Sequence, residues 1–369
     1  MEFVFWQNII SIHQKAFLEA LVKEPGVGSV LLVVEHELTP VRRDMGWETP
    51  ELKGVDVVLS PTEEKIESIV VAHKDAVHTM GGIRIGNMIT QAFDACIGNN
   101  CRIGVMTEPY DDTGVKGALR KIKYRYYKTK YFRHVQFVLA IGKQAQSQYT
   151  ELGYDAARLF PWAYFITLDQ RTQNAVAAKK EAIRIIYAGR LEEAKGIYRF
   201  LCELADFSEK NFKLDIYGTG EDEEKIIELI AAKGLSDNVT LTRFLKYKEL
   251  LEKYRDYDWV VLPSTQKDGW GVVISEGLLN GLRAICSKKC GVSEVIKEGV
   301  NGTTFDWGTA GSCNESIGRM LAGNGFASGE DIRTWANRAI SGEAGARYFM
   351  AIMDNLNNNN EKPRLPWTM

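Results

Sequence analysis

The chain has 369 residues, of which 45% are hydrophobic and 25% are charged, and its formal net charge is -2 at pH 7. This length is typical of two domains, and a net charge near zero argues against a chain built throughout to bind polyanions. The apolar runs are too short to cross a bilayer. The six cysteines are scattered, and Glu2 stands where a signal peptide would carry positive charge, so we expect a cytosolic protein with reduced thiols.

Short apolar runs alternate with amphipathic segments along the first half. The predicted strands are residues 3–6, 30–34, 55–59, 76–78, 103–106 and 137–141, with a helix around residues 16–22. Strands that alternate with helices are typical of a parallel sheet covered on both faces. We therefore predict an α/β, Rossmann-like domain over residues 1–166. Residues 158–165, with Pro161 among aromatic side chains, are expected to pack at a hinge.

The alternation pauses at residues 167–182, which are polar and alanine-rich and are interpreted as a linker. It resumes with predicted strands at residues 183–188, 213–217, 239–241, 259–262 and 284–287. We predict a second doubly wound domain over residues 183–335, facing the first across a cleft. A helix over residues 336–356 is expected to cross back to the first domain, and the tail, residues 357–369, is expected to be frayed.

A phosphate site is predicted where the strands of the second half end, because ligands of such sheets bind at their carboxyl edge. In "YAGRLEEAKG", Gly189 permits a tight turn after a strand, and Arg190 and Lys195 are placed at the start of the next helix. Cations beside free helix N–H groups suit a diphosphate. A solvated basic pair is the competing interpretation. Gly218 and Gly220 in "IYGTGEDEE" repeat the turn, with a weaker signal.

The stretch "KDGWGVVISEG" places two acids on either side of a tight turn. Gly269 and Gly271 let the backbone approach a ligand, and the following helix points N–H groups at an anionic phosphate. Asp268 can accept hydrogen bonds from sugar hydroxyls, and Glu276, more than one turn into the helix, can reach a ribose. The competing interpretations are a cap or turn residue and a surface acid. The donor-binding residues predicted here are Asp268, Gly269, Trp270, Gly271, Val272 and Glu276.

The motifs "AGRLEEAKG", "IYGTGEDEE", "VLPSTQKDGWGVVISEGL" and "CGVSEVIKEGVNG" resemble the C-terminal half of the family-four retaining glycosyltransferases, also called glycosyltransferase group 1. The resemblance is strong over residues 183–307 and implies the two-domain GT-B fold. It implies Arg190 and Lys195 on the donor diphosphate, Asp268 near the donor sugar and Glu276 on the ribose. The family usually has glutamate at both acidic positions, so the aspartate at 268 is a departure that bears on the sugar contact.

Candidates on the acceptor side come from the first half. Family members often carry a histidine after a strand that faces the cleft, and the comparable stretch "IGVMTEPYDD" offers Glu108 instead. Glu108 is therefore a positional candidate for holding the acceptor or balancing transition-state charge. His78 in "AVHTMGG", and His13 and Gln14 near the first strand-to-helix turn, are further candidates. For each of them a structural role in a loop or core competes.

Residues 116–133 are basic and rich in tyrosine, and no acid occurs between Asp112 and Glu151. Such a helix suits an anionic membrane surface, where each cation contributes on the order of 1 kcal/mol. A solvated helix face is the plain alternative, and no nucleic-acid-binding motif accompanies the segment. The predicted membrane patch consists of Lys116, Arg120, Lys121, Lys123, Arg125, Lys128, Lys130 and Arg133.

Together these features predict a retaining glycosyltransferase that needs no metal or other cofactor and lies at the inner face of the cell membrane. It would move a sugar from a nucleotide diphosphate, expected to be UDP, to a glycan or lipid-linked glycan, as in polysaccharide or lipopolysaccharide biosynthesis. Arg190 and Lys195 would stabilise charge on the leaving diphosphate, with Asp268 and Glu108 as further catalytic candidates. Two alternatives stay open: a sugar-nucleotide 2-epimerase on the same scaffold, and a non-catalytic sugar-nucleotide-binding subunit. Residues 256–258, Asp-Tyr-Asp, are interpreted as structural rather than as a metal site.

Overall fold

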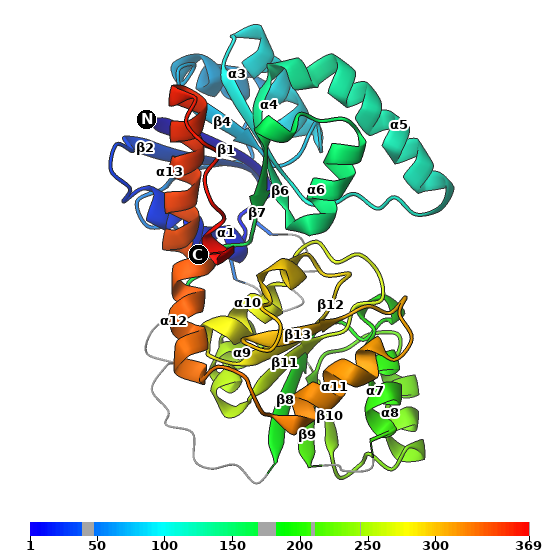
Figure 1. The fold of residues 1–369 in the computed structure, drawn as a ribbon. Helices are drawn as coiled ribbons and strands as arrows, with labels where there is room; N and C mark the ends of the chain where they lie inside the picture. Colours follow the sequence, from blue (N-terminus) through cyan, green and yellow to red (C-terminus); the bar gives the residue numbers. More distant parts are fainter. Residues whose placement is uncertain (39–47, 169–181, 208–210, 244, 369) are drawn as a thin grey trace. The chain divides into compact units, whose positions relative to one another are not determined.

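The computed structural model describes residues 1–38, 48–168, 182–207, 211–243 and 245–368. The chain divides into two compact units (Figure 1). Unit 1 comprises residues 1–166 and 338–369, and unit 2 comprises residues 167–337. Most of the predicted linker, residues 167–182, lies outside the described residues.

Unit 1 is built on a seven-stranded parallel sheet in the order β3-β2-β1-β4-β5-β6-β7. Its strands are β1 (Glu2–Ile9), β2 (Ser29–His36), β3 (Asp56–Leu59), β4 (Val77–Met80), β5 (Arg102–Thr107), β6 (Val135–Ile141) and β7 (Leu159–Trp162). The strand order reverses between β1 and β4, which pair directly. The central strands are buried along most of their length, as a sheet covered on both faces requires.

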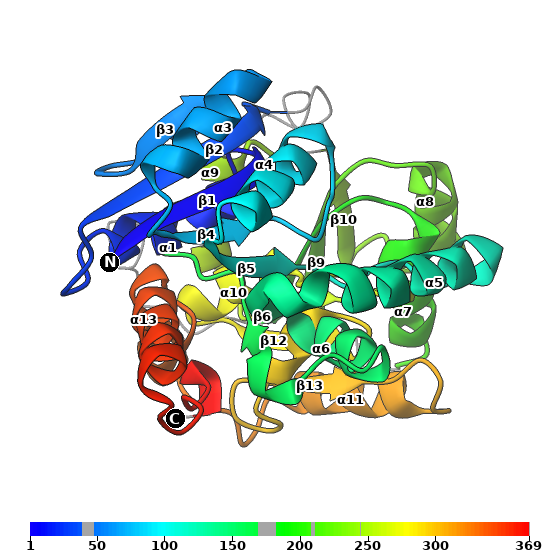
Figure 2. The same cartoon turned by 90° about the horizontal axis from the view of Figure 1, so that it is seen from above.

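Helices cover both faces of this sheet (Figures 1 and 2). One face carries α3 (Glu63–Ala72), α4 (Asn87–Gly98), α5 (Gly114–Tyr131) and α6 (Gly142–Glu151), whose apolar residues share a core with the strands. The other face carries α1 (Ile12–Leu21) and α13 (Gly342–Asn358), which pack against each other. Phe349 of α13 lies at the centre of an aromatic cluster, with its ring 5.3 Å from that of Phe3 and 5.6 Å from that of Phe17. The C-terminal segment is therefore part of the core of unit 1.

The C-terminal segment differs from the sequence prediction in two ways. The single helix predicted over residues 336–356 is two helices, α12 (Gly329–Ala339) and α13, because Ser341 interrupts the first and caps the second by accepting from the Ala344 N–H at 3.2 Å. The prediction of a frayed tail is wrong. Trp367 is 3% exposed and packs against Tyr348, and Lys362 Nζ donates to the Leu159 carbonyl at 2.6 Å.

Unit 2 is built on a six-stranded parallel sheet in the order β10-β9-β8-β11-β12-β13. Its strands are β8 (Ile183–Ala188), β9 (Phe212–Tyr217), β10 (Val239–Thr242), β11 (Trp259–Leu262), β12 (Arg283–Ser287) and β13 (Gly302–Phe305). On one face α7 (Ile197–Ala205), α8 (Glu223–Ala232) and α11 (Ser312–Ala322) form a core with the strands. The helix α10 (Val272–Leu279) packs on β11 and β12. In the sequence, α9 (Tyr247–Lys253) precedes β11 and α10 follows it.

The predicted fold class, two doubly wound parallel α/β sheets, is confirmed. The sequence analysis missed the strands at two sheet edges, β7 and β13. Residues 158–165, predicted to pack at a hinge, supply β7, where Pro161 is tolerated because an edge strand has no partner on one side. Short edge strands with proline or threonine give a weaker apolar signal than central ones.

Candidate functional site

The predicted donor residues of unit 2 lie at the carboxyl edge of its sheet, where the strand order reverses between β8 and β11. The loop after β8 and the loop after β11 contact each other at this point. Thr265 N–H donates to the Ala194 carbonyl at 3.0 Å, and a Cβ on Gly196 would come within 2.1 Å of the Pro263 carbonyl. Such a switch point is where open α/β sheets bind ligands.

Lys195 and Asp268 form an ion pair that bridges these two loops. Lys195 Nζ lies 2.6 Å from Asp268 Oδ2, and their side chains are 22% and 16% exposed. Ser264 Oγ donates to the same carboxylate oxygen at 3.0 Å. The prediction that Lys195 starts a helix is wrong, because it lies in a 3-10 turn, Glu193–Lys195, and α7 begins after it at Ile197. The cation predicted to hold a phosphate and the acid predicted to hold a sugar thus touch each other.

Arg190 was predicted to lie at the start of a helix, but it lies in the loop after β8. Its side chain is 58% exposed, and Nη1 lies 2.9 Å from Glu192 Oε2. Its carbonyl accepts a hydrogen bond from the Tyr187 hydroxyl at 2.7 Å, which fixes the backbone of the loop. The guanidinium is therefore exposed and paired within its own loop, while the backbone that carries it is held.

The predicted glycines bring the turns after β8 and β9 close together. A Cβ on Gly218 would come within 1.9 Å of the Gly189 carbonyl, and one on Gly220 within 2.2 Å of the Leu191 carbonyl. Gly189 N–H in turn donates to the Tyr217 carbonyl at 3.0 Å. Close approach of the two backbones thus explains Gly218 and Gly220 without a ligand, so their donor-binding role remains a prediction.

The turn before α10 is held by the segment that follows β12. Asp268 N–H donates to the Lys289 carbonyl and its carbonyl accepts from the Gly291 N–H, each at 3.0 Å. Gly271 has a φ of 93°, and a Cβ there would meet Leu262 Cδ2 at 2.4 Å, so only glycine fits. Gly269 belongs to the same turn, and Val272 is the first residue of α10.

The ring of Trp270 is buried, so the donor contact predicted for this residue stays a prediction for its backbone. The side chain is 1% exposed, and its Nε1–H donates to the Ser275 hydroxyl at 3.0 Å. The indole therefore anchors the turn to the first turn of α10.

Glu276 is buried inside unit 2, at 1% exposure. Its Oε2 accepts from the Tyr254 hydroxyl at 2.9 Å, while Oε1 has no hydrogen-bond partner among the residues that the structure describes. Burial raises the pKa of this carboxyl to about 7, although the hydroxyls of Tyr254 and Tyr247 oppose the change. The competing interpretation as a surface acid is wrong. A buried carboxyl oxygen without a partner is unfavourable unless a ligand supplies one.

Unit 1 has a pocket of about 210 Å³ at the carboxyl ends of β1, β4, β5 and β6. It brings together two predicted acceptor-side residues, Gln14 and Glu108. The Tyr164 hydroxyl donates to Glu108 Oε1 at 2.5 Å, and Gln14 Nε2 donates to Met106 Sδ at 3.6 Å. Four further polar residues that line the pocket were not predicted, although the place of Gln7 and Asn8 at the end of the first strand was a usable signal. They are Gln7, Asn8, Ser11 and Tyr164.

The two predicted acceptor-side histidines do not line this pocket. His78 is fully buried, and its Nδ1 accepts from the Trp6 indole at 3.1 Å while its Nε2 donates to the His73 carbonyl at 2.9 Å. It lies near the start of β4, whereas the pocket lies beyond the end of that strand at Gly81. These contacts give His78 the structural role in the core that was the competing interpretation. His13 is on α1, with its ring 5.7 Å from that of Tyr164.

The basic segment forms α5 and the turn after it, and the helix exposes apolar side chains as well as charged ones. Exposed fractions are 79% for Val115, 61% for Leu119, 62% for Ile122 and 53% for Tyr126. At about 100° per residue these four positions fall on one face of a helix. The opposite face is anchored by the ring of Tyr124, which stacks on that of Tyr110. Figure 2 shows α5 along the outside of unit 1.

Among the described residues, no helix combines the length and the apolar character needed to cross a bilayer.

The Asp-Tyr-Asp segment before β11 has structural contacts: Asp258 Oδ2 accepts from the Arg184 N–H at 2.8 Å.

Residues 169–339 match the model of the family described as glycosyl transferases group 1. An uncharacterized glycosyltransferase of Methanocaldococcus jannaschii is 27% identical over 171 residues, which are 45% of this chain and 44% of the relative. The match thus spans less than half of that relative's length.

Two crystal structures share the fold over nearly the whole chain. A glycosyltransferase from Rickettsia africae matches with a TM-score of 0.72 at 12% identity, covering 97% of this chain and 99% of the other. HepE of Anabaena, in complex with UDP, matches with a TM-score of 0.70 at 14% identity, covering 96% and 100%. At these identities the likeness concerns the fold.

Proposed function

Through residues 169–339 this chain belongs to the glycosyl transferases group 1, and from that premise we propose that it is a retaining glycosyltransferase. It moves a sugar from a nucleotide-diphosphate donor to a hydroxyl of a glycan or lipid-linked glycan. The observation that carries this proposal is the group of charged side chains at the switch point of unit 2. A paired cation and acid lie at its rim, and a buried acid with one oxygen unpartnered lies in the helix that follows.

The donor's diphosphate, in this proposal, takes the place of Asp268 as the partner of Lys195. The present ion pair keeps the Lys195 ammonium in place, with Asp268 fixed on both sides by backbone hydrogen bonds. Arg190, on an anchored backbone and largely exposed, swings from Glu192 to the same diphosphate. Asp268, released from Lys195, accepts from hydroxyls of the donor sugar. Its side chain is one methylene shorter than the glutamate usual in the family.

Glu276 is the proposed partner of the ribose. A carboxylate can accept two hydrogen bonds, and vicinal ribose hydroxyls donate two. Glu276 Oε2 already accepts from Tyr254, and its buried Oε1 has capacity left. Uridine is the proposed base, because the structural neighbour from Anabaena has been crystallised with UDP. Gly189, Gly218, Gly220, Gly269 and Gly271 let the backbone lie close to the nucleotide.

Leaving-group stabilisation is the proposed source of catalysis. When the anomeric bond breaks, negative charge grows on the diphosphate. Fixed positive groups aimed at that charge lower the barrier more than they stabilise the bound donor. Lys195 and Arg190 supply full charges, and the N-terminus of α10 supplies N–H groups. The acceptor is proposed to bind in the pocket of unit 1, with Glu108 and Gln14 positioning its hydroxyl.

A panel of nucleotide sugars tests this proposal. Incubation with the right UDP-sugar and no acceptor should give slow release of UDP and free sugar, because water can replace the acceptor. An epimerised donor would indicate the alternative sugar-nucleotide 2-epimerase. Tight UDP binding without any turnover across the panel would indicate a non-catalytic subunit. Either outcome would overturn the transferase assignment.

We further propose that α5 binds an anionic membrane surface, which would bring a lipid-linked acceptor to the enzyme. The exposed apolar side chains form a stripe along the helix, made of Val115, Leu119, Ile122 and Tyr126. By helical geometry, basic residues flank this stripe on both sides. One side has Lys116, Lys123 and Lys130, and the other side has Lys121 and Arg125. Interfacial binding has two components: apolar side chains enter the boundary of the acyl chains, and cations beside them bind lipid phosphates.

Replacing Leu119 and Ile122 together by glutamine should weaken binding to phosphatidylserine-containing vesicles by about tenfold or more. Transfer of each side chain out of water contributes about 1.5–3 kcal/mol when complete, and the charge of the helix does not change. Ile227→Gln, at a residue of α8 that is 52% exposed, is the matched control and should bind as the wild type does. Vesicle co-sedimentation measures both, and equal binding of the double variant and the wild type would contradict the membrane proposal.

A further inference from the structure

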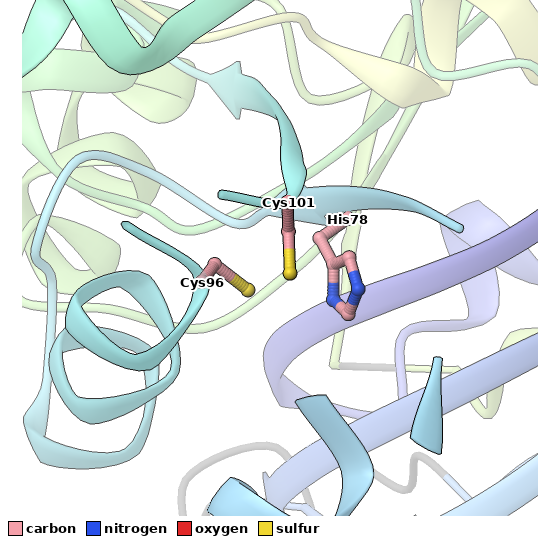
Figure 3. Close-up of side chains that lie close together, drawn as sticks. All are labelled: His78, Cys96 and Cys101. Atoms are coloured by element: carbon pink, nitrogen blue, oxygen red, sulfur yellow. The ribbon is translucent and has the colours of Figure 1, made fainter. Parts of the chain in front are cut away.

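Three side chains with metal-binding atoms lie close together inside unit 1, away from the pocket. His78 of β4, Cys96 of α4 and Cys101 just before β5 place ligand atoms within 4.8 Å of one another. In Figure 3 the two sulfur atoms and the imidazole ring face a common space. They lie near the start of β4 and β5, whereas the pocket lies beyond the other end of these strands.

The backbone around the group is fixed by hydrogen bonds. Cys101 N–H donates to the Cys96 carbonyl at 2.9 Å, which holds the end of α4 against the start of β5. The His78 ring donates from Nε2 to the His73 carbonyl at 2.9 Å. In metal sites, a histidine typically binds the metal through one ring nitrogen while the other ring nitrogen donates to a backbone carbonyl, which orients the ring. At present the remaining ring nitrogen of His78, Nδ1, accepts from the Trp6 indole at 3.1 Å.

The donor set selects the kind of ion. Two thiolates and an imidazole are soft or borderline ligands, which favour zinc-like and other thiophilic ions over Mg²⁺ or Ca²⁺. Zinc binds sulfur at about 2.3 Å and nitrogen at about 2.0–2.1 Å, so tetrahedral ligands lie roughly 3.5–3.8 Å apart. Small side-chain rotations from the observed separations would reach that geometry. We propose that His78, Cys96 and Cys101 bind one Zn²⁺ ion, with water as the fourth ligand, which ties α4 to β4 and β5.

This site is independent of the proposed sugar transfer, since it lies in unit 1 at the sheet edge opposite the pocket. Its role is to stabilise unit 1. The ion would also replace the Trp6 indole as the partner of the imidazole if it binds Nδ1, so the proposal predicts competition between the ion and that hydrogen bond.

Thiol protection in the wild-type chain provides a direct test. Cys101 and Cys202 are both partly exposed, so alkylation of Cys202, in unit 2, is a matched control. With Zn²⁺ at about 100 times its dissociation constant and a phosphine reductant present, alkylation of Cys101 should slow about 100-fold. Cys202 should react at an unchanged rate, and Mg²⁺ should protect neither. Equal rates at Cys101 with and without Zn²⁺ would overturn the proposal.

Variants give a second test that does not depend on alkylation. The wild-type chain should bind one equivalent of Zn²⁺ and melt at a higher temperature with it. Cys96→Ser and Cys101→Ser should each abolish the melting shift, whereas Cys202→Ser should keep it. Full retention of the shift in either of the first two variants would place the ion elsewhere and contradict the proposal. If a variant does not fold, the protection of Cys101 in the wild type still decides the matter.

Discussion

Lys195→Ala is expected to lower kcat by about 100- to 1,000-fold, the loss typical when one preorganised group that stabilises developing negative charge is removed. The variant should fold normally, because Lys195 is partly exposed and lies in a loop turn rather than in a strand or helix of the core. Steady-state assays with the donor found in the nucleotide-sugar panel measure kcat, and circular dichroism reports the fold. Lys213→Ala is the matched control. Lys213 is an exposed lysine near the start of β9, far from the carboxyl edge, and should leave kcat unchanged.

The ion pair with Asp268 allows a sharper form of this experiment. If Lys195 served only to neutralise Asp268, then Asp268→Asn in the Lys195→Ala background would restore activity. If Lys195 stabilises the leaving diphosphate, the double variant stays as slow as the single one or slower. Recovery of wild-type kcat in the double variant would remove the leaving-group argument, and so would an unimpaired Lys195→Ala.

Glu276→Gln is expected to lower kcat/KM for the donor by about 10- to 100-fold, since hydrogen bonds to a charged group contribute about 1.5–3 kcal/mol each. It should also change the pH profile. Burial raises the pKa of Glu276 to about 7 in the donor-free protein, and only the ionised carboxylate can accept from both ribose hydroxyls. The wild-type kcat/KM should therefore rise with pH through about 7, and the variant should lack that rise.

The same residue predicts a pH dependence of stability. The folded protein holds the Glu276 proton more tightly than the unfolded chain, in which the carboxyl has its ordinary pKa of 4.5. The contribution of the Glu276 carboxyl to the free energy of unfolding is therefore fully present below about pH 4.5 and is lost as the pH rises through about 7. Relative to wild type, Glu276→Gln should gain roughly 2–3 kcal/mol in unfolding free energy between pH 5 and pH 8.

Denaturant titrations at the two pH values measure this difference. Glu228→Gln, at an exposed position of α8, is the control for both experiments and should show neither effect. A wild-type kcat/KM that is flat between pH 5.5 and pH 8.5 would contradict the proposed ionisation of Glu276, as would a stability difference that does not change with pH.

The central strands and the donor motifs could be predicted from sequence because both have local signals. A strand buried on both faces is a short apolar run, and a glycine turn with charged residues at the end of such a run marks the carboxyl edge of the sheet. The edge strands β7 and β13 lack that signal, because proline and threonine interrupt their apolar runs. The break between α12 and α13 had a local signal, Ser341 followed by Gly342, that the apolar periodicity obscured.

The contacts that modify the site could not be predicted, because their partners are far apart in the sequence. Nothing near Asp268 indicates that Lys195 will pair with it, and nothing near Glu276 indicates that Tyr254 will bury it. The surroundings of His78 could not be predicted for the same reason, since Trp6, which donates to its ring, lies on the neighbouring strand β1 and is far away in the sequence. The stripe on α5 could have been found from the spacing of Val115 and Leu119, but the surrounding cations dominated the pattern.

A crystal structure of the chain with bound UDP or its UDP-sugar donor tests the central claim most directly. The account predicts the diphosphate within hydrogen-bond distance of Lys195 Nζ, a ribose hydroxyl donating to Glu276, and Asp268 no longer paired with Lys195. A nucleotide bound away from the carboxyl edge of β8 and β11, or a ribose without contact to Glu276, would contradict it.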